Sequence, residues 1–217
     1  MEKTFSEIHK NHLMVSSMRI VCSVSLISLA VLVLSGCAST HFKVTGQVPH
    51  QPLCQPVGEQ ASALVFWGTN WRLDQKEVPL REAAAQRGIE HFFSTSECFA
   101  KVRVIHKVGD RESIELQPAE VPGLAATYAS APVHVLFITV RELGPIVKLF
   151  SSLALVEGGT DVVLEIRAFS PSTGQTTADF TAHWQNGGPW VIKGVSTLEQ
   201  DITSALQEAL KPSKVPK

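Results

Sequence analysis

The chain has 217 residues, carries a formal net charge of −1, and is 44% hydrophobic and 18% charged. Its apolar content is enough for a core, which excludes a largely disordered protein, and its length fits one domain or two small ones. Phosphate binding needs clustered Lys and Arg, so the near-zero charge and the lack of basic runs exclude a nucleic-acid partner. The four cysteines show no paired C-x-x-C spacing, which argues against a zinc fold.

The N-terminal part of the chain has the three parts of an export signal. Arg19 gives a basic start, an uncharged apolar stretch follows it, and small residues stand where cleavage would occur. A transmembrane anchor is the alternative, but the uncharged stretch is at the short limit for a span. We therefore predict a signal peptide over 1–36. Because Glu2 and Glu7 do not fit a basic n-region, we expect translation to start at Met18 or the first residues to come from an over-long gene assignment.

The motif Leu34-Ser35-Gly36-Cys37 ends the apolar stretch and resembles the lipobox of bacterial lipoproteins. In that family the cysteine is acylated, palmitate included, and becomes the first mature residue, so the resemblance implies a lipid on Cys37. Ala38 follows, where the inner-membrane retention signal of such systems is Asp, which implies the outer membrane, facing the periplasm. Each buried CH₂ contributes about 0.8 kcal/mol, so several acyl chains would anchor the protein without a membrane span.

The segment 37–59 contains three prolines and few apolar residues. This composition predicts a semi-extended tether between the lipid and a globular part, and the tail 212–217 is also predicted to be disordered. Cys54 and Cys98 remain besides Cys37, and an oxidising periplasm favours a disulfide between them. The bond would close a loop of about 45 residues and contribute about 4 kcal/mol in the chain-entropy model. Two free thiols, one of them catalytic, are the alternative.

The range 60–211 is predicted to be a single α+β periplasmic domain that opens with a β-α-β unit. Ala61–Trp67 is apolar, as in a buried strand, and Phe99–His106 is a β-branched, alternating second strand. Between them, a helix is predicted to open with the capping box Asp74-x-x-Glu77 and to end at Gly88. A weaker helix is predicted over 118–131.

The nearly all-apolar run after this helix predicts a central third strand. Turn signals at Gly144-Pro145, at Gly158-Gly159 and at Pro171–Gly174 follow it at close spacing, which predicts an antiparallel meander. The four strands of this meander are predicted over Val133–Arg141, Ile146–Val156, Asp161–Phe169 and Thr176–Trp184.

The C-terminal element has the clearest helical pattern. Ser196-x-x-Glu199 is a capping box, the apolar residues from Leu198 to Leu210 form one stripe, and Pro212 ends the helix. The complete order of elements predicts an α+β fold, with a mixed sheet and helices packed on it.

This order resembles the TolB amino-terminal domain and the related periplasmic domains of curli-secretion and penicillin-binding-protein-activator lipoproteins. The similar pieces are the strand-to-helix unit at Ala61–Gly88, the strand at Val133–Arg141, the Ser-Thr-Gly turn after Phe169, and the closing helix. The resemblance is one of topology. It implies a partner-binding module of the envelope and no catalysis, although fold similarity alone does not settle function.

The residues that could carry chemistry give weak signals for an enzyme. His106, His134 and His183 lie on predicted strands and would have to meet in space to bind a metal, since none has local metal-site spacing. A G-x-S-x-G nucleophile elbow does not occur in the sequence. Glu165 and Asp179 are a candidate carboxylate pair, with surface charge as the alternative. We therefore expect no enzymatic activity, no cofactor and no metal.

Four tryptophans lie in or near predicted loops. They are Trp67, Trp71, Trp184 and Trp190. One interpretation is that they cap the core, since tryptophan often seals the end of a sheet. The other is that they form a contact patch for a protein or glycan partner.

We expect a lipid-anchored periplasmic binding or assembly factor at the outer membrane. It would bind the membrane through the acyl chains on Cys37 and an unidentified envelope protein through the tryptophans or an open sheet edge. The alternative is a lipoprotein subunit of an envelope transport or secretion complex, in which the domain oligomerises or hands on a ligand. A third class, an envelope hydrolase, would require His106, His134 or His183 to converge with a carboxylate.

Overall fold

A computed structural model describes residues 39–49, 51–54, 61–109, 111–128, 131–150, 155–189, 191 and 193–211. The predicted signal peptide, Cys37, Trp190 and the predicted tail 212–217 lie outside the described residues. Among the residues that the structure describes, no helix is long and apolar enough to cross a membrane.

The centre of the domain is one six-stranded mixed sheet with the strand order β1-β6-β5-β4-β2-β3. β2 pairs in parallel with both β3 and β4, whereas β4–β5, β5–β6 and β6–β1 are antiparallel. The α+β class and the central place of the apolar third strand are therefore confirmed. The strands are β1 (Ser39–Gln47), β2 (Ser62–Thr69), β3 (Lys101–His106), β4 (His134–Phe150), β5 (Leu155–Phe169) and β6 (Thr176–Pro189).

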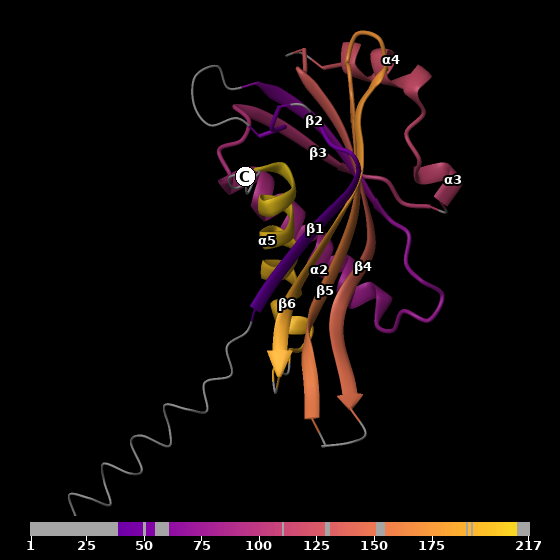
Figure 1. The fold of residues 1–217 in the computed structure, drawn as a ribbon. Helices are drawn as coiled ribbons and strands as arrows, with labels where there is room; N and C mark the ends of the chain where they lie inside the picture. Colours follow the sequence, from indigo (N-terminus) through magenta and orange to yellow (C-terminus); the bar gives the residue numbers. More distant parts are fainter. Residues whose placement is uncertain are drawn as a thin grey trace, which may run out of the picture. The chain divides into compact units, whose positions relative to one another are not determined.

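Two long helices, α2 (Val78–Thr95) and α5 (Leu198–Leu210), cover one face of the sheet, as Figure 1 shows. Alternation in the strands sends one row of apolar side chains toward these helices. On β5 this row, Val162 to Ala168 in steps of two, is fully buried. The apolar stripe of α5 packs against it, with Leu198, Ile202 and Leu206 also fully buried. The predicted β-α-β unit and the predicted stripe are both confirmed.

A second, smaller layer covers part of the opposite face. It consists of α3 (Arg111–Ile114), the 3₁₀ turn η1 (Pro118–Glu120) and α4 (Val121–Ala126), so the weaker helix predicted over 118–131 exists only as short pieces. Its buried residues, among them Leu116 and Val121, pack on Phe137 and Phe169 of the sheet. The rest of this face, over β5, β6 and the second half of β4, is left outside that layer.

Part of the predicted tether, 37–59, is a strand instead of a linker. Residues Ser39–Gln47 form β1, an edge strand that pairs antiparallel with β6 from Gly187 to Asp179. Its side chains are exposed except Val44, which is half-buried. An edge strand exposed on both faces shows no hydrophobic alternation, so its composition resembles that of a linker.

The antiparallel meander is present, but it has three long strands instead of the four that were predicted. β4 runs through Gly144-Pro145, and β5 runs through Gly158-Gly159, which faces Gly188 and Gly187 of β6. A β-carbon on Gly159 would lie 2.6 Å from the α-carbon of Gly187, so these glycines allow two backbones to approach closely. Pro145 is tolerated because β2 stops pairing with β4 at Val140 and leaves an edge there.

The helix ends differ from their predicted capping. Neither α2 nor α5 has a side-chain cap, and a 3₁₀ turn, η2 (Val195–Thr197), leads into α5. Glu199 instead pairs with Arg87 of α2 at 2.8 Å. Gly88 does not end α2, which continues for seven more residues to Thr95.

The predicted disulfide is present and joins Cys54 to Cys98, both buried. It fixes the chain before β2 to the segment between α2 and β3. The backbone N–H of Cys54 also donates to the carbonyl oxygen of Leu210 at 3.1 Å, which ties the same segment to the end of α5.

Candidate functional site

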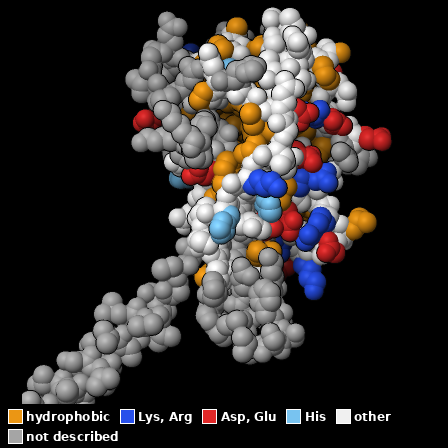
Figure 2. Space-filling view, viewed as in Figure 1, with side chains coloured by type: hydrophobic (Ala, Val, Ile, Leu, Met, Phe, Trp, Pro, Cys, Tyr) orange, Lys and Arg blue, Asp and Glu red, His pale blue; other side chains and the backbone are white. Residues whose placement is uncertain are grey.

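The sheet face turned away from α2 and α5 carries a concentrated group of polar and charged side chains. In Figure 2, Lys, Arg, Asp, Glu and His side chains form a belt across the middle of the molecule. The same alternation that buries one row of β5 places Asp161, Glu165 and Arg167 in the opposite row. We name this surface the polar face; it comprises Thr139, Arg141, Glu142, Asp161, Val163, Glu165, Arg167, Asp179, Thr181, His183 and Gln185.

A β-bulge in β4 increases the charge on the polar face. The β4–β5 register shifts between Val140, which faces Leu164, and Glu142, which faces Val163. Arg141 is the extra residue, and it pairs with Glu165 at 3.6 Å. A bulge of this kind re-aims side chains, here bringing two adjacent charged residues to one surface.

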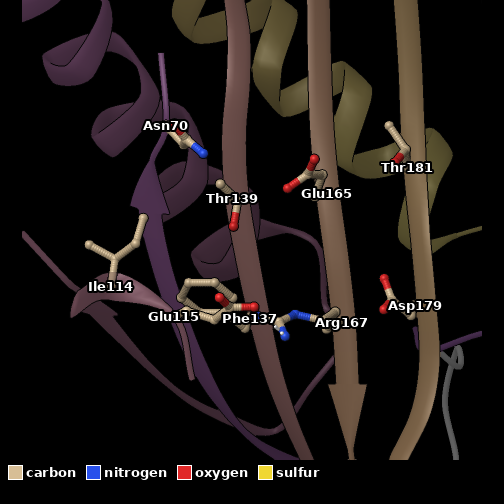
Figure 3. Close-up of a pocket in the computed structure, with 9 residues that line it drawn as sticks. All are labelled: Asn70, Ile114, Glu115, Phe137, Thr139, Glu165, Arg167, Asp179 and Thr181. Carbon is tan, nitrogen blue, oxygen red and sulfur yellow. Dashed lines mark ion pairs between the residues drawn. The ribbon is translucent and has the colours of Figure 1, made fainter. Parts of the chain in front are cut away.

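A pocket of about 250 Å³ lies in the polar face (Figure 3). Arg167 lines the pocket between Phe137 and Asp179 and forms an ion pair with Glu115, Nη1 to Oε1, at 3.0 Å. Its guanidinium group also lies 5.4 Å from the ring centre of Phe137 and 5.8 Å from that of Phe169. These contacts orient the planar guanidinium group, which carries five N–H donors, in the wall of the pocket. The lining residues are Asn70, Ile114, Glu115, Phe137, Thr139, Glu165, Arg167, Asp179 and Thr181.

A second charged group lies further along the same face, beyond the bulge. Glu142 pairs with Arg72 at 3.1 Å, and His183 pairs with Asp161 through Nε2 and Oδ1. Burial raises the pKa of Glu142, and the neighbouring Asp161 raises it further, while Arg72 and His183 act in the opposite direction. Two carboxyl groups thus share a partly desolvated site with two basic side chains.

The charged groups in and around the pocket are arranged in pairs of opposite sign. Glu165 and Asp179, the predicted carboxylate pair, both line the pocket, but the strand register places Arg167 opposite Asp179, and Glu165 pairs with Arg141. Each charged group is therefore set against a group of opposite charge. Within the described part of the chain, no group of three His, Cys, Asp or Glu residues could hold a metal ion.

The three strand histidines do not converge. His106 stacks on Trp67 with ring centres 3.8 Å apart and faces Glu82 at 3.3 Å. His134 faces Ala63, four residues from Trp67 along β2, and burial lowers its pKa. His183 lies on β6, on the other side of β4 and β5. His183 and His106 each meet one carboxylate, Asp161 and Glu82 respectively, so the hydrolase alternative stays a prediction that this geometry does not decide.

Two of the four tryptophans are core residues, so they do not contribute to the predicted contact patch. Trp67 and Trp184 are 1% and 3% exposed and belong to the core under the helices. Trp71 is half-buried and packs against the same core, and Trp190 lies outside the described residues. The reason is that β2 and β6 extend further than the turn signals indicated, so their alternation points Trp67 and Trp184 inward.

Sequence reasoning missed Arg167 as a pocket residue, although a signal was present. In the run from Asp161 to Phe169, charged residues occupy one face and small or branched apolar residues the other. The pairing of Glu115 with Arg167, and the bulge at Arg141, depend on tertiary contacts that the run does not encode.

Comparison with known proteins gives no family for this chain. No family model matches it, and no curated protein is significantly similar. Similar solved structures include a PelC dodecamer from Paraburkholderia phytofirmans, with 15% identity and a TM-score of 0.41 over 81% of this chain and 100% of that one. Lipoprotein GNA1162 from Neisseria meningitidis has 14% identity and a TM-score of 0.38 over 68% and 96%, respectively. The hypothetical protein CT253 from Chlamydia trachomatis has 11% identity and a TM-score of 0.38 over 70% and 99%. At these TM-scores the likeness assigns no function, and the resemblance to TolB stays a prediction.

Proposed function

We propose that this protein is a lipid-anchored, non-enzymatic binding or assembly factor of the bacterial envelope, attached to the outer membrane through Cys37 and facing the periplasm. It acts by protein–protein contact through the polar face. The lipobox-like motif and the preceding apolar stretch support the anchor and the location.

One observation carries the binding function: the sheet has one face covered by helices and an opposite face with a charged pocket. Arg167 and Glu165 lie in the pocket with 21% and 39% of their side-chain surface exposed, so a partner can reach them. A surface with interspersed charges of both signs selects a partner with the complementary pattern, because like charges placed together cost several kcal/mol. The partner is therefore an envelope protein with a mixed-charge surface.

The alternative function, a subunit of an envelope transport or secretion complex, is favoured by β1. This edge strand has nine residues, of which all but Val44 are exposed; Lys43 is its one charged side chain, and it contains no proline. Most sheet edges are blocked by charges, prolines or bulges, so a long unblocked edge is suited to pairing with another strand.

In-cell photo-crosslinking of the lipidated protein separates these functions. A photo-reactive residue replaces Thr181 in the pocket, and the matched control replaces Gln86, which is exposed on the outer side of α2. A third position, Thr45 of β1, tests the edge strand.

A discrete envelope protein crosslinked from Thr181 and not from Gln86 is the expected result. Crosslinks between copies of the chain from Thr45, with none from Thr181, would favour the complex subunit instead. Equal products from Thr181 and Gln86, or bare monomer from all three positions, would contradict binding through the polar face.

A further inference from the structure

Three hydrogen-bond acceptors in the pocket of the polar face lie on three neighbouring strands. Thr139 of β4 faces Glu165 of β5, and Asp179 of β6 faces the residue two positions further along β5. Side chains diagonal to one another across a strand pair lie about 7–8 Å apart, which is within reach of one long side chain. A single polar group placed in the pocket can therefore contact all three acceptors.

Thr139 is the acceptor that points most directly to a ligand. It is only 7% exposed, and its hydroxyl group has no hydrogen-bond partner within the described part of the chain. In Figure 3 this hydroxyl group points into the space that the labelled residues surround. Buried polar groups are almost always hydrogen-bonded in folded proteins, so a buried hydroxyl that faces an open pocket indicates the position of a ligand atom.

Asp179 adds a negative charge that its neighbours do not neutralise. It faces Arg167 in the strand register, but the guanidinium group of Arg167 points away from it and toward Glu115 (Figure 3). Among the residues that the structure describes, none forms an ion pair or a side-chain hydrogen bond with the carboxylate of Asp179. This carboxylate is exposed, so an incoming cation can reach it.

Glu165 also retains capacity to accept hydrogen bonds. Its contact with Arg141 is 3.6 Å long, which is an ion-pair distance and too long for a hydrogen bond. The charged residues that line the pocket are Glu115, Glu165, Asp179 and Arg167, and Arg141 lies beside them. One negative charge is left over, which favours a cation as the occupant.

The ammonium group of lysine matches these acceptors better than the guanidinium group of arginine. Lysine carries three N–H donors on a compact head, one for each of the three acceptors. Arginine favours a flat aromatic surface, but the guanidinium group of Arg167 already lies 5.4 Å from the ring centre of Phe137. The pocket, of about 250 Å³, suits one long side chain.

We infer that the pocket receives a lysine side chain of the partner protein, whose ammonium group donates to Thr139, Glu165 and Asp179. This inference rests on the proposed function and assigns the basic part of the mixed-charge partner to one place on the polar face. Arg167 has five N–H donors and uses one on Glu115, so it keeps donors for an acidic or carbonyl group of the same partner beside the lysine.

A water-soluble carbodiimide tests the inference, because it joins a carboxylate to an amine in contact with it. The reagent activates the carboxyl group, the lysine Nζ attacks the activated carbon, and an amide forms as the reagent leaves as a urea. Membranes from cells that make the full lipidated protein are treated, and crosslinked peptides are identified by mass spectrometry. We expect an amide between Glu165 or Asp179 and a lysine of the protein that is captured by the photo-reactive residue at Thr181.

A charge-neutral double variant gives a second measurement. Glu165→Gln with Asp179→Asn keeps the shape of both side chains and removes both charges. The amide should disappear, and photo-crosslinking from Thr181 should fall severalfold. Glu90→Gln with Glu97→Gln is the matched control, because it makes the same change in net charge at two exposed positions and should leave the capture unchanged.

The outcomes separate this inference from the proposed function. A partner captured from Thr181 without an amide at Glu165 or Asp179 would overturn the lysine contact and leave the proposed function intact. An amide to the amine of a lipid headgroup, or an equal loss of capture in both double variants, would overturn the lysine contact as well. Capture of no partner from Thr181 would contradict the proposed function, and the lysine contact with it.

Discussion

Gly88 of α2 and Ile202 of α5 meet at a helix–helix contact that has no room for a β-carbon. A β-carbon built on Gly88 would lie 2.2 Å from Cγ2 of Ile202 and 2.6 Å from the carbonyl oxygen of Glu199. The hydroxyl of Thr203 donates to the carbonyl oxygen of Gly88 at 3.1 Å across the same contact. The glycine in the middle of α2 thus sets the distance between the two helices that cover the sheet.

Gly88→Ala is expected to lower the free energy of unfolding by about 1–2 kcal/mol. Alanine favours a helix by about 1 kcal/mol over glycine, but overpacking a contact that includes backbone costs about 1–3 kcal/mol. Urea unfolding measures the difference. Gly123→Ala is the matched control, because Gly123 lies in α4 with nothing within 4 Å of its β-carbon position, so stability should stay the same or rise. Equal effects of the two substitutions would contradict the close contact.

Asp201 is a buried carboxylate that connects the start of α5 to β5 of the sheet. It accepts hydrogen bonds from Thr160 at 2.6 Å and Thr197 at 2.9 Å, and pairs with Lys193 at 2.9 Å. Asp201→Ala would leave Lys193, 16% exposed, and the fully buried Thr160 without this partner. We expect a loss of about 3 kcal/mol, in the range for breaking a buried ion pair.

The matched control for Asp201→Ala is Arg87→Ala. It removes the pair between Arg87 and Glu199, whose side chains are 58% and 44% exposed. Exposed pairs contribute about 0–1 kcal/mol, so thermal unfolding should separate the two variants clearly. A similar small decrease in the unfolding temperature of both variants would show that the hydrogen bonds and ion pair of Asp201 do not stabilise the fold.

The fold was predictable where burial imposes a pattern on the sequence. The alternation in Asp161–Phe169 and the stripe of α5 are such cases, because each element buries one face against the other. Glycine and proline at 144–145 and 158–159 do not form turns: they lie where two backbones approach closely and where a strand edge is free. Short-range signals do not distinguish these uses, since the difference lies in the neighbouring strand.

The candidate site was harder to predict than the fold. The ion pair of Arg167 with Glu115 joins β5 to a segment that precedes β4, and the pair of Arg72 with Glu142 joins β4 to the loop after β2. The partners in such pairs are far apart in the sequence, so no local sequence pattern predicts that they meet. The tryptophans gave a misleading signal for the same reason: a large apolar residue beside a glycine resembles a loop contact until the strand length is known.

Glu142 predicts a pH dependence of stability with a definite sign. Burial, aided by Asp161, raises its pKa in the folded protein above its ordinary value of 4.5. The folded state then binds more protons than the unfolded state between these two pKa values, so this group destabilises the protein as the pH rises through that window. Its favourable contribution is fully present below the unfolded pKa and lost above the folded one.

Glu142→Gln removes this titration. The stability of the wild type relative to Glu142→Gln should therefore fall between about pH 4 and about pH 7, because only the wild type must ionise the buried carboxyl. Urea midpoints of both proteins at the two pH values measure it, and the other carboxyl groups cancel in the comparison. A difference that stays constant, or that changes in the opposite direction, would rule out a raised pKa at this position.

Arg167→Glu is expected to reduce partner crosslinking from Thr181 severalfold while the protein remains folded. The substitution replaces the guanidinium N–H donors in the pocket with a carboxylate. This carboxylate would repel the neighbouring Glu115 instead of pairing with it. Arg103→Glu is the control, because it makes the same change in net charge on β3, where Arg103 lies 5.0 Å from the ring centre of Tyr128. Crosslinking should fall only in the Arg167 variant. The difference between this variant and the wild type should decrease as salt is added, because salt screens the charges. An equal loss in both variants would indicate that net charge, and not the pocket, governs binding.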